Sequence, residues 1–142
     1  MKYIAEKLNF TKQSISEMKA NSKKFYVQMK KRRSVRYFKR TSIDINIIKN
    51  AILSAGTAPS GANLQPWHFV IIKNDKIKKE IRIAAEKEEK KFYNKIAPKA
   101  WLDALKPLGT NSNKKFLEEA PILIVIFEKI FSIKKNIKIK NY

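Results

Sequence analysis

The apolar run at residues 121–127 constrains the fold of this chain more than any other segment. Its sequence, PILIVIF, contains no charged residue and is rich in β-branched side chains. A run of this kind predicts a strand that is buried on both faces. The tail that follows, residues 128–142, consists mostly of Lys, Ile and Asn and offers little apolar surface to cover a second face. The sequence therefore predicts either a partner chain that supplies the missing layer or a fold that is incomplete in these residues.

Helical periodicity surrounds this strand. A helix is predicted from Glu17 to Gln28 with Ser14 or Ser16 as its cap, and a second, of about ten residues, follows the caps in residues 41–44. A strand at residues 68–73 precedes a third helix, which begins after Asn74 and extends to Tyr93. Its expected inner face is apolar: Ile77, Ile81, Ala84 and Ala85. The order of elements predicts an α+β fold with helices around a small mixed sheet, incomplete in this chain.

The chain divides into three regions by pattern. Residues 1–30 are expected to form an N-terminal helical segment, residues 31–127 the main domain, and residues 128–142 a tail. Within the domain, residues 96–113 contain two prolines, a glycine and a polar run. A loop of that length in a domain is usually functional, and we interpret it as a lid with Trp101 and Leu105 as its apolar closing residues.

Charge and composition exclude several classes of function. The formal net charge is +20, but the lysines are scattered through every segment and do not form a basic stripe, which argues against specific nucleic-acid binding. Nonspecific adhesion to polyanions at low salt is expected. With no cysteine and one histidine, no metal site is predicted. There is no N-terminal apolar signal and no long apolar span, so we expect a cytoplasmic protein without a membrane segment.

Two segments indicate a ligand. Residues 30–38, KKRRSVRYF, hold the densest arginine cluster, and arginine binds phosphate with two parallel hydrogen bonds. Residues 58–67, APSGANLQPW, form a turn whose backbone N–H groups stay free, and Gly61 allows close approach of another group. The alternatives are a solvated basic turn and an ordinary helix-to-strand loop.

Four motifs together resemble the flavin-dependent nitroreductase superfamily. They are RRSVR at 32–36, TAPSGANLQPW at 57–67, the glutamate-rich helix that ends at Tyr93, and EAPILIVIF at 119–127. The resemblance covers residues 22–127 and is greatest to the iodotyrosine deiodinase branch. It implies a nitroreductase-like fold in which FMN is held between the two subunits of a homodimer.

The resemblance also implies which residues contact the cofactor. The residues that match the family's phosphate and polar-edge ligands are Arg32, Arg33, Ser34 and Arg36. Ser60 and Gly61 match the residues that line the flavin. Both assignments agree with the chemistry of the residues, because an arginine cluster suits a phosphate and a glycine-bearing loop suits a flat ring.

A second set of matching residues would bind the substrate. The backbone of Ala62 matches the group that binds a substrate phenolate, and Glu89, Tyr93 and Lys114 match a clamp for the amino and carboxylate groups of a halotyrosine. Glu89 and Tyr93 lie four residues apart, on one helix face. The residues alone favour a different interpretation of Glu89, as a surface carboxylate paired with neighbouring lysines.

The resemblance implies that NAD(P)H reduces FMN, which then removes halide from a halotyrosine or reduces a nitroaromatic or a quinone. No side chain is assigned a catalytic role, since the flavin carries the redox step. Family members continue with a dimer-core helix, a threonine at flavin N5 and a further arginine, which have no counterpart here. The sequence therefore predicts a truncated member. Three hypotheses follow: an FMN-dependent oxidoreductase, an inactive truncated remnant that needs a partner chain, or a small basic binding protein without flavin.

Overall fold

The computed structural model describes residues 5, 7–134 and 137–140, which fall into two compact units, Met1–Val35 and Arg36–Tyr142. The first unit contains one described helix, α1 (Ile15–Lys30). Ser14 caps it, because its hydroxyl accepts from the Glu17 amide and its own amide donates to the Glu17 carboxylate. The predicted helix is therefore confirmed, with Ser14 as the cap, and none of its residues is buried within the unit.

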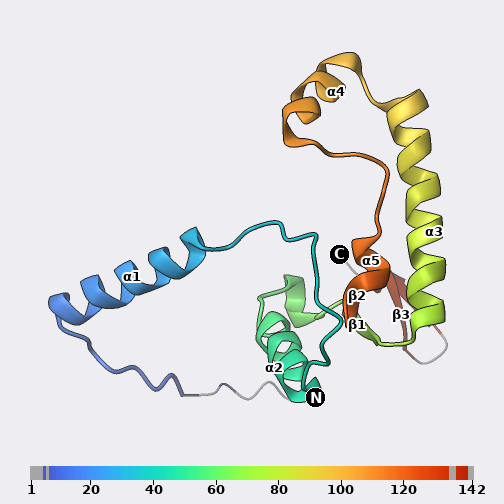
Figure 1. The fold of residues 1–142 in the computed structure, drawn as a ribbon. Coiled ribbons are helices and arrows are strands. Elements are labelled where there is room, and N and C mark those ends of the chain that lie inside the picture. The colour runs from blue at the N-terminus through green and yellow to red at the C-terminus, as the bar shows by residue number, and fades with distance from the viewer. Residues whose placement is uncertain (1–4, 6, 135–136, 141–142) are drawn as a thin grey trace. The chain divides into compact units, whose positions relative to one another are not determined.

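The second unit carries the remaining elements, which Figure 1 shows in order along the chain. Asp44 caps α2 through its carboxylate, and Asn74 caps α3. Gly56 is the last residue of α2. The described elements are α2 (Ile45–Gly56), the 3-10 helix η1 (Gly61–Asn63), β1 (Trp67–Ile72), α3 (Asp75–Lys91), the π-helix η2 (Phe92–Ile96), α4 (Lys99–Leu105), the 3-10 helix η3 (Lys106–Leu108), α5 (Phe116–Glu119), β2 (Leu123–Glu128), β3 (Phe131–Lys134) and β4 (Ile137–Lys140).

Strands β1 and β2 pair antiparallel, with Val70 opposite Val125, and β3 pairs antiparallel with β4. The predicted α+β class is confirmed, although the described strands form two antiparallel pairs and no mixed sheet. The prediction that β2 is buried on both faces is wrong within this chain. Ile124 and Ile126, which share one face of the strand, are 40% and 63% exposed, and Phe127 on the other face is 54% exposed.

Helix α3 packs against α5 through a polar face. The predicted apolar inner face is wrong in part, since Ile77 is 46% exposed whereas Lys78 is 3% exposed. The Nζ of Lys78 donates to the carbonyl of Ala120 at 2.8 Å and pairs with Asp75 at 2.9 Å. The burial of a lysine is tolerated because its ammonium group is hydrogen-bonded.

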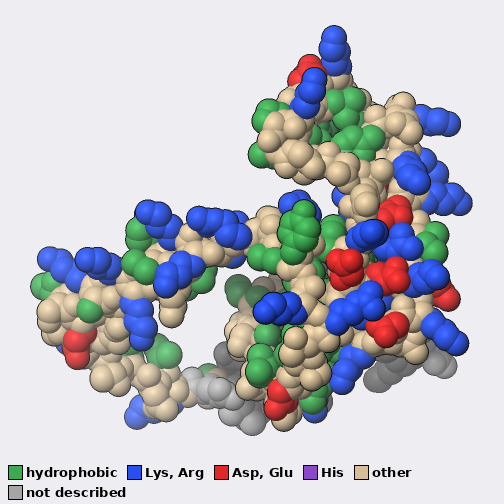
Figure 2. Space-filling model, viewed as in Figure 1, with side chains coloured by type: hydrophobic (Ala, Val, Ile, Leu, Met, Phe, Trp, Pro, Cys, Tyr) green, Lys and Arg blue, Asp and Glu red, His purple; other side chains and the backbone are tan. Residues whose placement is uncertain are grey.

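Many lysine and arginine side chains of the described residues lie on the surface. In the face that Figure 2 shows, lysine and arginine side chains are spread over the chain rather than gathered in one stripe. This distribution agrees with the expectation from the sequence. Among the described helices, none combines the length and apolar character needed to cross a membrane.

The segment between α3 and α5 is more regular than a loop. It begins with the π-helix η2, where the amide of Ala97 donates to the carbonyl of Phe92 at 2.9 Å, and continues through α4 and η3. Figure 1 shows the chain passing from the end of α3 through α4 and back to α5. The ring of Phe92 meets that of Trp101 edge to face, with centroids 5.2 Å apart. An aromatic contact therefore ties α4 to the end of α3.

Candidate functional site

The loop between α2 and β1 has an unusual backbone. Three of its residues are left-handed without being glycine: Ala62 at φ 49°, Asn63 at φ 52° and Gln65 at φ 45°. The hydroxyl of Ser60 accepts from the Gln65 amide at 2.9 Å and closes the loop on itself. Left-handed backbone is costly for alanine and glutamine and tends to gather at functional sites. The backbone conformation therefore supports a binding role for this loop.

The same loop offers free donors and open space. The amides of Ser60, Gly61 and Ala62 make no hydrogen bond to any described residue. A Cβ placed on Gly61 would meet no atom within 4 Å. A flat ligand with acceptor atoms at its edge can therefore approach the main chain here and receive hydrogen bonds.

The arginine cluster follows the C-terminal end of α1. Arg33 Nη1 donates to the carbonyls of Lys30 and Arg32, at 2.7 and 2.9 Å. The guanidinium groups of Arg32 and Arg36 have no ionic partner among the described residues, and both residues are exposed. Arg32, Arg33 and Ser34 belong to the first unit, and Arg36 to the second together with the other expected site residues.

The structure brings Glu89 and Lys114 together. Glu89 lies on α3, and Lys114 lies just before α5, where the segment through α4 ends. Lys114 Nζ is 3.2 Å from Glu89 Oε2 and donates to the carbonyl of Asn111 at 3.0 Å. Both residues line an open groove of about 560 Å³ together with the side chains of Phe92 and Phe116. Glu89 is therefore not an isolated surface carboxylate, because its partner comes from a distant part of the chain.

Tyr93 lies one turn beyond Glu89 and contacts a different residue. Its hydroxyl is 3.1 Å from Thr110 Oγ1, and no described contact joins it to Lys114. The sequence analysis did not assign Thr110 to the site. The polar run at residues 110–113, next to Lys114, is the only signal that pointed to it.

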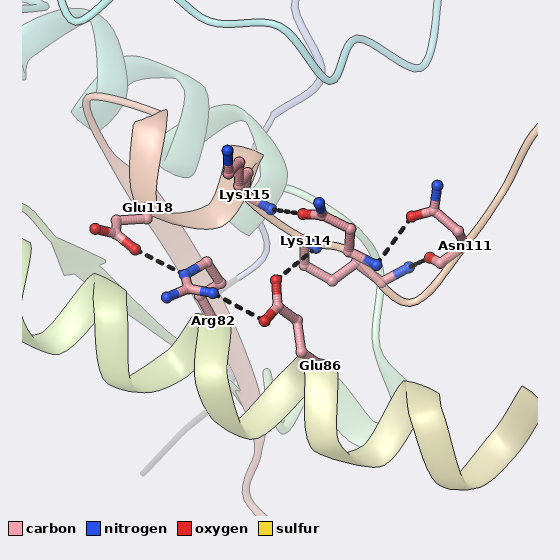
Figure 3. A network of polar contacts seen from close by, with 7 residues as sticks. Arg82, Glu86, Asn111, Lys114, Lys115 and Glu118 are labelled. Atoms are coloured by element: carbon pink, nitrogen blue, oxygen red, sulfur yellow. Dashed lines mark hydrogen bonds and ion pairs between the residues drawn. The ribbon is translucent and has the colours of Figure 1, made fainter.

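A polar network that could not be expected from the residue pattern alone includes Lys114 (Figure 3). Arg82 Nη1 donates to Glu86 Oε2 at 2.8 Å, and Arg82 Nε donates to Glu118 Oε2 at 2.7 Å. The other oxygen of Glu86, Oε1, accepts from the backbone amide of Lys114 at 2.9 Å. The opposite charges at positions 82 and 86, four apart on a helix, were the available signal.

This network makes a prediction for the pH dependence of stability. The amide of Lys114 lowers the pKa of Glu86, as do Arg82 and Lys90, although desolvation opposes them. A carboxyl with a lowered folded pKa stabilises the fold fully above its unfolded pKa, near 4.5, and loses that contribution as pH falls through the folded value. Glu86→Gln should therefore be less stable than the unsubstituted chain at pH 7, and this difference should shrink as the pH falls from about 4.5 through the folded pKa of Glu86.

Urea unfolding of both proteins between pH 7 and pH 3 measures this difference. The acidic groups that have no contact with Glu86 or Arg82 remain in both proteins and cancel in the comparison. A difference in free energy of unfolding that stays constant to pH 3 would contradict the assignment.

The chain is similar to known proteins over most of its length. The family model described as the nitroreductase family matches residues 29–140. The iodotyrosine deiodinase of Haliscomenobacter hydrossis is 46% identical over 117 residues, which are 82% of this chain and 53% of that protein. That of Hydra vulgaris is 43% identical over 123 residues, which are 87% of this chain and 45% of that protein. The chain spans about half the length of the curated relatives it matches.

A solved structure is similar over most of the chain. It is described as oxidized iodotyrosine deiodinase bound to FMN and 3-iodo-L-tyrosine, and it matches with a TM-score of 0.66 and 35% identity. The match covers 78% of this chain and 57% of the other. The family expected from the four sequence motifs is thereby confirmed. Because the family model matches well over half of the residues of this chain, the chain belongs to the nitroreductase family.

Proposed function

We propose that this chain forms the cofactor- and substrate-contacting part of an FMN-dependent oxidoreductase that removes halide from halotyrosines. The observation that carries the proposal is the ion pair between Glu89 and Lys114 at the groove beside α3. Support also comes from the relatives, which are named iodotyrosine deiodinases, and from the similar structure described with FMN and 3-iodo-L-tyrosine.

The residues present fit FMN by their chemistry. The proposed phosphate ligands, Arg32, Arg33, Ser34 and Arg36, supply the planar donors that bind phosphate in pairs. Ser60 and Gly61 supply free amides and an open approach, as a flat ring with polar edges requires.

The substrate fits the charges of the groove. The ammonium group of an amino acid would pair with Glu89, and its carboxylate would pair with Lys114 and the hydroxyl of Tyr93. A zwitterion inserted there replaces the existing ion pair without leaving either charge unpaired, which limits the desolvation cost. The free amide of Ala62 would donate to the phenolate oxygen and favour the ionised ring.

The residues of this chain orient and enclose the reactants. FMN, once bound and reduced by NAD(P)H, would supply the two electrons that, with one proton, convert the carbon–halogen bond into a carbon–hydrogen bond and a halide ion. Residues 96–113 close as a lid, with Trp101 and Leu105 excluding water. The proposed protein is a cytoplasmic homodimer that uses NAD(P)H as its reductant, with residues 1–30 as a helical segment, 31–127 as the domain and 128–142 as a tail.

The test is the visible absorption spectrum of the purified chain during titration with FMN and then with 3-iodo-L-tyrosine. We expect saturable changes in the flavin bands in both steps. FMN binding with no response to 3-iodo-L-tyrosine, but turnover of a nitroaromatic or quinone, would overturn the substrate. Absence of FMN binding would overturn the proposal and favour a remnant that needs a partner chain, which co-purification of a second polypeptide would reveal.

A further inference from the structure

We infer that Glu86, held in place by Arg82, is a positioning residue that fixes Lys114 for the substrate clamp. The inference rests on the proposed function for its consequence in binding, and on the geometry of this chain for the positioning itself. Neither Glu86 nor Arg82 is expected to touch the substrate.

The first observation is that the two carboxylate oxygens of Glu86 accept hydrogen bonds from two different donors. One accepts from Arg82 at 2.8 Å and the other from the Lys114 amide at 2.9 Å. The side chains of Arg82 and Glu86 are 20% and 18% exposed, so little water competes for these bonds. A carboxylate with both oxygens engaged has one orientation, and the guanidinium group of Arg82 fixes it.

The second observation is that two glutamates hold the same lysine at different points. Glu86 and Glu89 lie three residues apart and therefore on one face of α3. Glu86 binds the main chain of Lys114, whereas Glu89 lies 3.2 Å from its Nζ. The position of the main chain decides whether the side chain reaches Glu89, because the bond to Glu86 fixes the point from which the side chain extends.

The third observation is the place of Lys114 in the chain. It directly follows residues 96–113, the proposed lid, and precedes α5. Arg82 also bonds Glu118 of α5, so the network joins α3 to both sides of this junction (Figure 3). A lid can move without displacing Lys114 only if its end is anchored, and the bond from the Lys114 amide to Glu86 provides that anchor.

The test compares Glu86→Ala with Glu118→Ala. Each removes one carboxylate partner of Arg82, but only Glu86→Ala removes the acceptor of the Lys114 amide. Hydrogen exchange of that amide, measured by NMR, should quicken about tenfold or more in Glu86→Ala and less than about threefold in Glu118→Ala. Glu86→Gln keeps an oxygen acceptor and should restore most of the protection, even if the alanine variant folds poorly.

The binding consequence is measured with 3-iodo-L-tyrosine on the FMN-loaded chain. Glu86→Ala should raise the dissociation constant for 3-iodo-L-tyrosine about tenfold. In a chain that already carries Lys114→Met, the same change should raise it less than about twofold, because the two residues act through one contact. Equal exchange rates of the Lys114 amide in Glu86→Ala and Glu118→Ala would overturn the inference. So would additive losses of 3-iodo-L-tyrosine affinity in the double variant of Glu86→Ala and Lys114→Met. If the unsubstituted chain binds no FMN or 3-iodo-L-tyrosine, the proposed function fails, while the exchange comparison still decides whether Glu86 fixes Lys114.

Discussion

Replacing Glu89 by glutamine is expected to weaken the binding of 3-iodo-L-tyrosine about 10- to 100-fold while changing the binding of FMN less than about threefold. Glutamine keeps the size of the side chain but removes the charge that would pair with the substrate ammonium group. In the unliganded chain the same change leaves Lys114 Nζ with the carbonyl of Asn111 as its remaining partner. Both titrations can be followed in the flavin absorption bands.

Glu80→Gln is the matched control. It removes a carboxylate from the same helix, at an exposed position that does not line the groove. An exposed charge outside the groove is screened by solvent, so neither ligand should bind differently in this variant. Similar losses of FMN and 3-iodo-L-tyrosine in Glu89→Gln would remove Glu89 from the clamp.

Replacing Gly61 by valine should reduce FMN affinity about 100-fold or more with little change in the stability of the chain, since forcing extra methyl groups against a close contact is costly. A Cβ at this position meets no protein atom within 4 Å, so the fold itself accommodates it. In the proposed complex, however, that space belongs to the flavin. Fluorescence titration with FMN and a urea unfolding curve measure the two effects separately.

Gly56→Ala serves as the control for Gly61→Val. Its added Cβ would lie 3.9 Å from Trp67 Nε1, an ordinary contact at the end of α2, and FMN binding should stay unchanged. Gly61→Ala should give an intermediate loss. Unchanged FMN affinity in a folded Gly61→Val protein would exclude this side of the loop as the flavin site.

The sequence predicted the elements that depend on local pattern. Capping residues and apolar spacing located α1, α2 and the start of α3, and the apolar run at residues 121–127 located β2. These features are set by neighbouring residues, so they can be read from a single chain. The Glu89–Lys114 pair joins residues that are far apart in sequence, and only the family resemblance suggested it.

The missed features arise from tertiary contacts. Lys78, Arg82 and Glu86 were not predicted as inner-face residues of α3. Each contacts a residue in or next to α5, and such contacts between distant segments cannot be derived from the helical period of α3. The left-handed backbone of Ala62 and Gln65 could not be read from residue type, since neither favours that conformation.

The π-helix Phe92–Ile96 adds one residue to the helical path that leads from Glu89 to α4. Since each residue of an α-helix turns the chain by about 100°, an extra residue changes the direction of everything that follows it. Gain or loss of a single residue here would change the direction in which α4, and with it Trp101, extends from α3. Arg82, Glu86 and Glu89 precede the π-helix and would keep their positions. A change of one codon is thus enough to redirect the proposed lid, residues 96–113, without altering the turns of α3 before it.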